Sequence, residues 1–253
     1  CGIVGSASTI KKIDKQWLNS ASKALYHRGP DDHGEWISDD LRLGLAHRRL
    51  TIIDITKNAR QPFVNHTNDA VIIFNGEIYN YLELRSELKQ AGYNFKSNSD
   101  TEVLLNSYHY WGHNCLKKIN GMFSFVIYDI IKKKIFAARD ICGQKPFYYT
   151  FTNDTLYFAS EIKSLIINKN IGSNISLDEV DFYLATGHSS SNKSIFKNIN
   201  KLKPSQALSF DLSSGELKTW TYWEPPNLSN LENESTEKEL IEKLETTIEA
   251  AVV

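Results

Sequence analysis

The first residue of the sequence, Cys1, carries both a thiol and an α-amino group, and this pair could do nucleophilic chemistry. A cysteine attacks as its thiolate, and the unperturbed pKa of the thiol is about 8.5. The α-amino group has a pKa of about 7.7–8.0, so it can take the thiol proton at a cost of only about 1 kcal/mol in water. Gly2 would let a substrate approach the backbone closely. Alternatively, Cys1 is merely the residue that a processing step leaves behind.

A second candidate is the dipeptide Asn75-Gly76, which follows the apolar run of residues 70–74. A side-chain amide beside an unhindered backbone N–H suits an oxyanion hole, where one donor is typically worth about 3 kcal/mol in the transition state. Asn-Gly is also the strongest short signal for a β-hairpin turn. The dipeptide taken alone favours a turn that ends the strand.

Charged residues supply the remaining candidates. Arg48 and Arg49 follow a predicted strand, and an arginine can hold a carboxylate through two parallel hydrogen bonds, whereas a solvated surface charge is the ordinary alternative for either residue. Asp100 lies just after Ser99, the first residue of the capping box Ser99-Asp100-Thr101-Glu102. An acid at this position is favoured by the helix dipole whatever else it does.

Composition limits the kinds of partner. The 253 residues include 29 Lys+Arg and 30 Asp+Glu, so a net charge of −1 gives no general attraction for nucleic acid or for an anionic membrane. The sequence has neither an apolar run of the roughly 18–20 residues that a membrane helix needs nor the pattern of a signal peptide. Cys1, Cys115 and Cys142 form no CxxC pair, and no HExxH motif occurs. We therefore expect a cytoplasmic chain without disulfides, a metal site, or a nucleic-acid or membrane partner.

Hydrophobic periodicity predicts a mixed α and β protein whose strands pair mainly as hairpins. Helices are predicted over residues 14–26, 80–90 and 100–111. Hairpins join antiparallel neighbours, so we expect antiparallel sheets instead of a doubly wound parallel sheet. The predicted strands are residues 2–7, 35–38, 41–46, 70–74, 123–130, 135–139, 147–151, 155–159, 207–211 and 216–221.

The composition changes at Pro225-Pro226, where residues rich in Asn, Ser and Glu begin. We predict a main domain over residues 1–223, a linker over 224–236 and a helix over 237–253. Thr236 and Glu239 would cap this helix, and its apolar end has no stop signal. The helix is therefore expected to lead into a further domain.

Several blocks of the sequence together resemble the glutaminase domain of class II glutamine amidotransferases, the N-terminal-nucleophile kind, and specifically that of glutamine-hydrolysing asparagine synthetases. They follow one another in the order of that family over residues 1 to about 165, and the resemblance fades over 166–223. The blocks are CGIVG at 1–5, HRGPDD at 27–32, AHRRLTIID at 46–54, NGEIYN at 75–80, SDTE at 99–102, GMFSF at 121–125, and RD, KP and FASEIK between 139 and 163.

The resemblance implies a fold and a role for each candidate. The fold would be the α+β, four-layer αββα sandwich of N-terminal-nucleophile hydrolases, with two mainly antiparallel sheets. Cys1 would form a thioester with L-glutamine, and the Asn75 side chain and the Gly76 N–H would form the oxyanion hole. Arg49, and not Arg48, would bind the substrate α-carboxylate, and Asp100 would bind its α-ammonium group. Ile53 and Glu77 would complete the substrate site. Cys115 and Cys142 would be structural.

The resemblance also implies a partner. An asparagine synthetase needs an ATP-pyrophosphatase domain with a Ser-Gly-Gly-x-Asp-Ser phosphate loop, and this sequence lacks that motif. The expected reaction is hydrolysis of L-glutamine to glutamate and ammonia, with the ammonia passed to a synthetase domain or chain. No cofactor is expected in this chain, because ATP and Mg belong to the absent synthetase half. The sequence leaves a homodimer open.

Two alternatives remain at this stage. The chain could be a glutaminase that becomes active only with its synthetase partner, or a non-catalytic glutamine-binding domain of such an assembly. A non-catalytic relative would typically have lost the nucleophile or its free amine. Because Cys1, Arg49, Asn75, Gly76 and Asp100 are all present, the sequence favours an active glutaminase.

Overall fold

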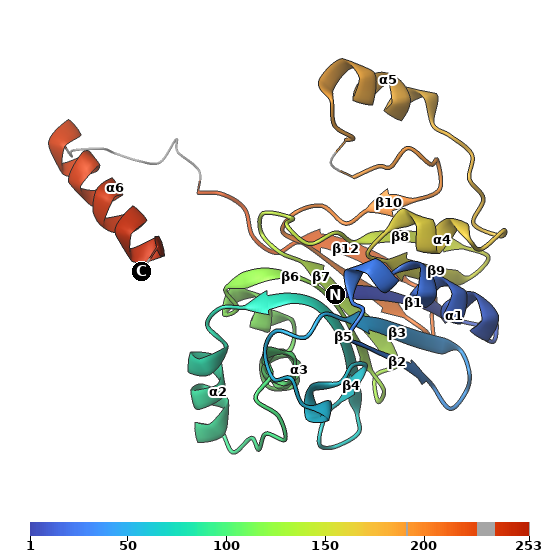
Figure 1. Ribbon diagram of the computed structural model, residues 1–253, viewed down its shortest axis with the longest axis horizontal. Coiled ribbons are helices and arrows are strands. Elements are labelled where there is room, and N and C mark those ends of the chain that lie inside the picture. The colour runs from blue at the N-terminus through green and yellow to red at the C-terminus, as the bar shows by residue number, and fades with distance from the viewer. Residues whose placement is uncertain (191, 227–235, 253) are drawn as a thin grey trace. The chain divides into compact units, whose positions relative to one another are not determined.

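The computed structural model describes residues 1–190, 192–226 and 236–252. It divides into two compact units, Cys1–Trp223 and Glu224–Val253, which are described separately. Figure 1 shows the first unit as two stacked sheets with helices on their outer faces. It holds the N-terminus and every candidate site residue.

The first sheet has six strands, and each neighbouring pair is antiparallel. β1 lies inside this sheet with a hydrogen-bonded strand on each side, so the chain begins next to the middle of the sheet and not at an edge. The order is β10 (Asn200–Lys201), β8 (Tyr148–Thr152), β9 (Thr155–Ala159), β1 (Gly2–Ser8), β3 (Leu43–Arg49) and β2 (Asp32–Ile37).

The second sheet is also six-stranded and antiparallel throughout. One expectation is wrong here: the strand predicted over residues 70–74 does not end at Asn75-Gly76 but continues to Ile78, with Gly76 opposite Phe123. Asn75-Gly76 is therefore part of the sheet and forms no turn. The order is β12 (Leu217–Thr221), β11 (Gln206–Asp211), β7 (Lys134–Arg139), β6 (Gly121–Asp129), β5 (Ala70–Ile78) and β4 (Phe63–Val64).

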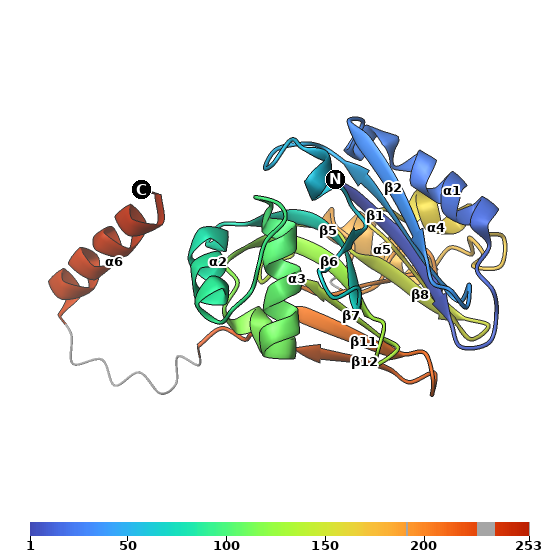
Figure 2. The same ribbon diagram turned by 90° about the horizontal axis from the view of Figure 1, so that it is seen from below.

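Helices cover the outer face of each sheet (Figure 2). Trp17 and Leu18 of α1 (Lys15–Ala24) and Leu165 of α4 (Ile162–Ile166) pack with Val4 on the first sheet. α2 (Tyr81–Gln90) and α3 (Asp100–Trp111) pack on the second sheet. A third apolar core lies between the sheets. The predicted four-layer αββα arrangement is confirmed.

The continuous apolar run of β5 reflects the burial of both faces of this strand. Successive strand residues point to opposite faces. Val71 and Ile73 belong to the core between the sheets, whereas Ile72 and Phe74 belong to the core beneath the helices. Both faces of β5 are thus buried, so apolar and polar residues do not alternate along this strand in the sequence.

The predicted capping box at the start of α3 forms only in half. The Ser99 side chain accepts a hydrogen bond from the Glu102 N–H at 3.3 Å. The buried Glu102 carboxylate accepts instead from the N–H groups of Lys96 and Ser97, so it ties down the chain before the helix. This carboxylate therefore holds the chain segment that precedes Asp100 against the first turn of the helix.

Several elements in the first unit were not predicted from the sequence. They are the helices α4 and α5 (Leu177–Thr186), the two-residue strands β4 and β10, and the 3-10 helices η1 (Tyr26–Arg28), η2 (Lys57–Ala59) and η3 (Gly112–Lys117).

In the second unit, α6 (Glu237–Val252) begins at a complete capping box. The Thr236 N–H donates to the Glu239 carboxylate at 2.7 Å, and the Glu239 N–H donates back to the Thr236 hydroxyl at 3.4 Å. Most of the predicted linker, residues 227–235, lies outside the described residues. Among the helices that the structure describes, none is long and apolar enough to cross a membrane.

Candidate active site

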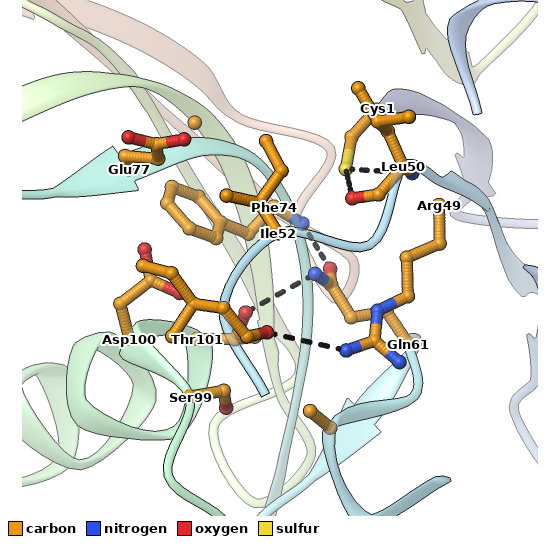
Figure 3. Close-up of a pocket in the computed structure, with 13 residues that line it drawn as sticks. Cys1, Arg49, Leu50, Ile52, Gln61, Phe74, Glu77, Ser99, Asp100 and Thr101 are labelled. Atoms are coloured by element: carbon orange, nitrogen blue, oxygen red, sulfur yellow. Dashed lines mark hydrogen bonds between the residues drawn. The ribbon is translucent and has the colours of Figure 1, made fainter. Parts of the chain in front are cut away.

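A pocket opens where β1 begins, β3 ends and α3 starts, and it encloses about 410 Å³ including the solvent at its mouth. Segments far apart in the sequence meet in it (Figure 3). Six of the seven residues proposed for the site line the pocket, and Asn75 does not. The six are Cys1, Arg49, Ile53, Gly76, Glu77 and Asp100.

Cys1 is fixed on two sides. Its Sγ lies 3.5 Å from the Leu50 N–H nitrogen and 3.6 Å from the Leu50 carbonyl oxygen. Its own carbonyl accepts a hydrogen bond of 2.9 Å from Arg28, whose guanidinium also pairs with Glu161 at 3.0 Å. Arg28 belongs to η1, so the end of the first helical segment orients the first residue.

The electrostatic environment of Cys1 favours a neutral α-amine. Burial lowers the pKa of this amine to about 6, and the positive charges of Arg28 and Lys145 act in the same direction. An amine with this pKa is mostly unprotonated at pH 7. It is therefore available as a general base beside the thiol, which is the pairing that a nucleophilic cysteine needs.

The free edge of β5 runs along the pocket. In an antiparallel pair, alternate residues turn their N–H and C=O groups away from the partner strand. Phe74, Gly76 and Ile78 are such residues: the Phe74 N–H donates to Gln61 at 2.6 Å, and the Ile78 N–H donates to Asp100 Oδ2 at 3.1 Å. The Gly76 N–H lies between these two and points toward the pocket.

The backbone also requires glycine at this position. A Cβ on residue 76 would lie 2.1 Å from the Met122 carbonyl oxygen and 2.7 Å from the Phe123 Cα. Both are backbone atoms of the neighbouring strand and cannot move aside. Gly76 thus combines a close approach to β6 with an N–H that is open to a ligand.

Asn75 lies behind the pocket. Its side chain shares the face of β5 that carries Ile73, so it points toward the space between the sheets. It is 2% exposed, and its Nδ2 has no hydrogen-bond partner in the described structure. A buried amide N–H without a partner is costly, and at a functional site it is a candidate donor to a ligand. Its predicted role in the oxyanion hole remains a prediction.

Two carboxylates face the pocket on the side opposite Cys1 and Arg49 in the view of Figure 3. Asp100, at the start of α3, is only 5% exposed. Burial raises its pKa to about 6, hydrogen bonds from backbone N–H groups such as that of Ile78 oppose the shift, and the nearby negative charge of Glu77 adds to it. A cationic ligand would lower this pKa again, because it would stabilise the ionised carboxylate.

The two neighbouring arginines have different surroundings. The buried Arg49 donates to the Thr56 carbonyl at 3.1 Å and to the Asp54 carbonyl, so the loop after β3 holds its guanidinium at the pocket. Arg48 points to the opposite face of β3 and donates to the Ser22 carbonyl at 3.1 Å. The pocket therefore contains one of the two candidate arginines.

Sequence reasoning did not single out two residues that hold the site together. His47 Nε2 lies 3.0 Å from the Phe74 carbonyl, which can only accept, so this nitrogen carries the hydrogen. Burial lowers the pKa of His47 to about 3, which keeps it neutral. Gln61 accepts from the Phe74 N–H and donates to the Thr101 hydroxyl at 3.2 Å. No spacing pattern marks a lone glutamine in a loop.

The described residues contain no group of three or more histidines, cysteines or acids that could hold a metal ion. His109 and His113 have the four-residue spacing that can place two ligands on one helix face, but α3 ends between them at Trp111. His113 stacks on Phe136, with ring centroids 4.4 Å apart, whereas the Tyr93 hydroxyl bonds His109 at 2.7 Å.

The other two cysteines lie apart from the pocket. Cys115 is buried in the core beneath α3, and burial raises the pKa of its thiol to about 12. Cys142 is exposed. Neither cysteine lines the pocket. The raised pKa of the Cys115 thiol also makes it a poor nucleophile.

Comparison with known proteins agrees with this architecture. The two stacked antiparallel sheets, with a pocket at the start of a central strand, define the fold of the N-terminal-nucleophile hydrolases. A family model described as "Glutamine amidotransferase domain" matches residues 1–223. The chain therefore belongs to the glutamine amidotransferase domain family, and the resemblance stated from the sequence is confirmed.

The similar proteins include glutamine-hydrolyzing asparagine synthetases. The chain is 38% identical over 261 residues to a Methanocaldococcus jannaschii protein assigned as asparagine synthetase 2, covering 96% of this chain and 50% of that protein. It is 37% identical over 228 residues to Bacillus subtilis asparagine synthetase 3, covering 88% of this chain and 36% of that protein. The chain thus spans half or less of the length of these relatives.

A solved structure supports the fold. The glutamine phosphoribosylpyrophosphate amidotransferase from B. subtilis has a TM-score of 0.65 to this chain at 19% identity, covering 90% of this chain and 50% of that one. At this identity the likeness concerns the fold alone.

Proposed function

We propose that this domain hydrolyses L-glutamine to glutamate and ammonia through a thioester on Cys1. The observation that carries the proposal is the pocket itself, which gathers a thiol, an arginine, an open backbone N–H and a buried carboxylate from four separate segments. These are Cys1, Arg49, Gly76 and Asp100. They match, group for group, what hydrolysis of an amino acid's side-chain amide requires.

The covalent step uses the two groups of Cys1. The α-amine, in a chain whose first residue is Cys1, takes the thiol proton, and the thiolate attacks the side-chain amide carbon of glutamine. The tetrahedral oxyanion accepts hydrogen bonds from the Gly76 N–H and, as proposed, from Asn75 Nδ2. The proton then passes to the leaving nitrogen, the C–N bond breaks, and ammonia departs. Water, deprotonated by the same amine, cleaves the thioester to glutamate and restores the thiol.

The remaining residues select an amino acid. The planar guanidinium of Arg49 can bind the α-carboxylate through two bonds. Asp100, with Glu77 beside it, would bind the α-ammonium group, and Ile53 would contact the substrate near the arginine. Each end of the substrate backbone thus has an oppositely charged partner. The separation of Asp100 from Arg49 in the view of Figure 3 gives the bound amino acid one orientation.

We further propose that residues 1–223 form the glutaminase and that α6 leads into a synthetase half, which uses the ammonia for an asparagine-synthetase-type amidation. The support is the match of this chain to half or less of relatives bearing that name. The glutaminase reaction itself needs no cofactor, whereas ATP and Mg would act in the synthetase half. We propose a cytoplasmic location.

Labelling with 6-diazo-5-oxo-norleucine, a glutamine-like electrophile, tests the proposal. We expect one adduct by intact mass, mapped to Cys1 and prevented by excess glutamine. Cys142 serves as an internal control, because it is exposed but lies outside the pocket. A protein with a free N-terminal amine that forms no adduct on Cys1, or that reacts equally at Cys142, would contradict the assignment.

A further inference from the structure

Gln61 connects the edge of β5 to the first turn of α3, which the bond from the Ile78 N–H to Asp100 also joins. It lies in the loop between η2 and β4, and its side chain is only 5% exposed in its pocket-lining position. Its Oε1 accepts from the Phe74 N–H at 2.6 Å, and its Nε2 donates to the Thr101 hydroxyl at 3.2 Å. Figure 3 shows the side chain bridging Phe74 and Thr101.

The bond to the Phe74 N–H takes the place of a hydrogen bond that a neighbouring strand would otherwise accept. β4 pairs with β5 only opposite Val71 and Ile72, so within the described part of the chain this edge of β5 has no neighbouring strand from Phe74 onward. Gln61 takes the Phe74 N–H, and His47 donates to the Phe74 carbonyl. Both backbone groups of Phe74 are thus held by side chains. Because a strand is extended and stiff, fixing Phe74 also fixes Gly76, two residues further along the same edge.

The second bond reaches the helix that carries the buried carboxylate. Thr101 follows Asp100 in the first turn of α3, and the Asp100 carboxylate itself bonds the Ile78 N–H. A change in the position of Thr101 would move Asp100 relative to β5. Gln61 therefore adds a second connection, beside the bond from the Ile78 N–H to Asp100, between the edge of β5 and the helix that carries the carboxylate.

We infer that Gln61 is a positioning residue, which aligns the Gly76 N–H with the thiol of Cys1 and holds Asp100 at a fixed distance from it. The inference rests on the proposed glutamine hydrolysis. Its two bonds have separable consequences. Loss of the Phe74 bond would misplace an oxyanion donor and lower kcat, whereas loss of the Thr101 bond would loosen the ammonium site and raise KM.

Three variants test this in the full chain. Gln61→Met keeps the volume and removes both bonds, and Thr101→Val removes only the bond to the helix. Gln206→Met is the matched control, because the Gln206 amide also accepts from a backbone N–H, that of Lys203 at 3.1 Å, away from the pocket. Glutaminase kinetics with L-glutamine and the amide hydrogen exchange of the Phe74 N–H are measured for each variant and for the parent.

We expect Gln61→Met to lower kcat at least tenfold, to raise KM and to speed Phe74 exchange at least tenfold. Thr101→Val should raise KM threefold or more, with kcat and Phe74 exchange within twofold of the parent, and Gln206→Met should change none of them. Unchanged kcat in a folded Gln61→Met protein overturns the inference, even where Phe74 exchanges faster. If Gln61→Met does not fold, unchanged KM in Thr101→Val overturns it instead.

The same data separate this inference from the proposed function. A parent chain that does not hydrolyse glutamine contradicts the proposed function. In that case, unchanged Phe74 exchange in Gln61→Met also removes the structural basis of the inference. Faster Phe74 exchange would show that Gln61 does hold the edge of β5, and only the proposed chemistry would then be wrong.

Discussion

At the scale of single residues, the site depends on groups whose ordinary behaviour the fold alters. Burial and two neighbouring cations make the α-amine of Cys1 a weaker base than in a free peptide, and this keeps it unprotonated at neutral pH. Burial also makes Asp100 a weaker acid than an exposed aspartate. Both pKa shifts disfavour the charged form of the group, as expected when a protein removes an ionisable group from water. The shift of the amine gives predictions about the reaction, and the shift of Asp100 gives one about stability.

The first prediction concerns the α-amine. Adding one residue before Cys1 moves the amine away from the thiol and should reduce glutamine hydrolysis by at least a hundredfold, while the thermal unfolding midpoint stays unchanged. The measurement is ammonia release by matched proteins with and without the extension. An uncleaved extension that retained full activity would refute the amine as the base.

The same group predicts the acid limb of the pH profile. With the pKa of the amine lowered to about 6, kcat/KM should fall as the pH drops through about 6, because the protonated amine cannot accept the thiol proton. Protonation of Asp100, whose pKa is raised to about 6, should steepen this fall by weakening the ammonium site. An unperturbed amine would place this limb about two units higher, near its reference pKa of about 8. Steady-state kinetics from pH 5 to 9 distinguish the two, and a midpoint near 8 would show that the fold does not shift this group.

The two neighbouring arginines give a third prediction. Arg49→Lys should raise the KM for glutamine at least tenfold, because an ammonium group cannot form the two parallel bonds that a guanidinium makes with a carboxylate. Arg48→Lys is the matched control: it alters the preceding residue, on the opposite face of β3, whose guanidinium bonds Ser22 and lies 6.0 Å from the centre of the Tyr26 ring. Similar KM values for the two variants would mean that the carboxylate binds elsewhere.

At the scale of elements, β5 determines what the chemistry can use. It is buried on both faces and is paired with β6 along one edge. Its other edge pairs with β4 only at Val71 and Ile72, and turns three later N–H groups toward side chains and the pocket. The central position of β1 and the start of α3 bring Cys1 and Asp100 to that edge. The site is thus an arrangement of strand and helix ends, and the loop after β3 contributes Ile53, holds the Arg49 guanidinium and contacts the thiol of Cys1 through Leu50.

A fourth prediction belongs to this strand. Asn75→Ala should lower kcat by roughly a hundredfold, the usual effect of removing one oxyanion donor. Ser124→Ala is the control, because Ser124 is the cross-strand neighbour of Asn75 and its hydroxyl is also buried without a partner. Equal kcat values for the two variants would remove Asn75 from the oxyanion hole and leave Gly76 as the donor.

The sequence predicted the type and order of most longer elements, because their apolar spacing and turn residues are local signals, but the ten-residue helix α5 was missed. It failed at Asn75-Gly76, where the preference of the dipeptide for a turn is overridden by pairing with β6. It also missed Gln61 and His47. Their importance comes from the backbone groups of one distant residue, Phe74, and no spacing within the chain records such a contact. Residue types singled out most of the candidate site residues, whereas their roles, the choice of Arg49 over Arg48, and Ile53 and Glu77 came from the family resemblance.

At the scale of the whole molecule, the site has an energetic cost to the fold. Because the folded-state pKa of Asp100 is raised, the protonated form is favoured on folding, and the stability that this gives at low pH is lost as the pH rises through about 6. At neutral pH the free protein therefore holds a buried charge that weakens it. Binding a cationic ligand group would restore part of the loss.

The fifth prediction follows from this cost. Asp100→Asn should become more stable relative to the parent as the pH rises from 4 to 7, by up to about 3 kcal/mol, since a shift of one pKa unit corresponds to about 1.4 kcal/mol. The same variant should bind glutamine poorly. Urea unfolding of both proteins at the two pH values measures the difference. A stability difference that is independent of pH would contradict the raised pKa.

The open edge of β5 has a last consequence, for association between molecules. An exposed strand edge is a ready template for another chain, and proteins commonly protect such edges against aggregation. Here Gln61, His47 and Asp100 occupy most of the edge, and a bound amino acid would occupy the part at Gly76. The same side chains that prepare the pocket for a small molecule therefore also shield the sheet from its neighbours. A descendant that lost the reaction would still be under selection to keep that edge covered.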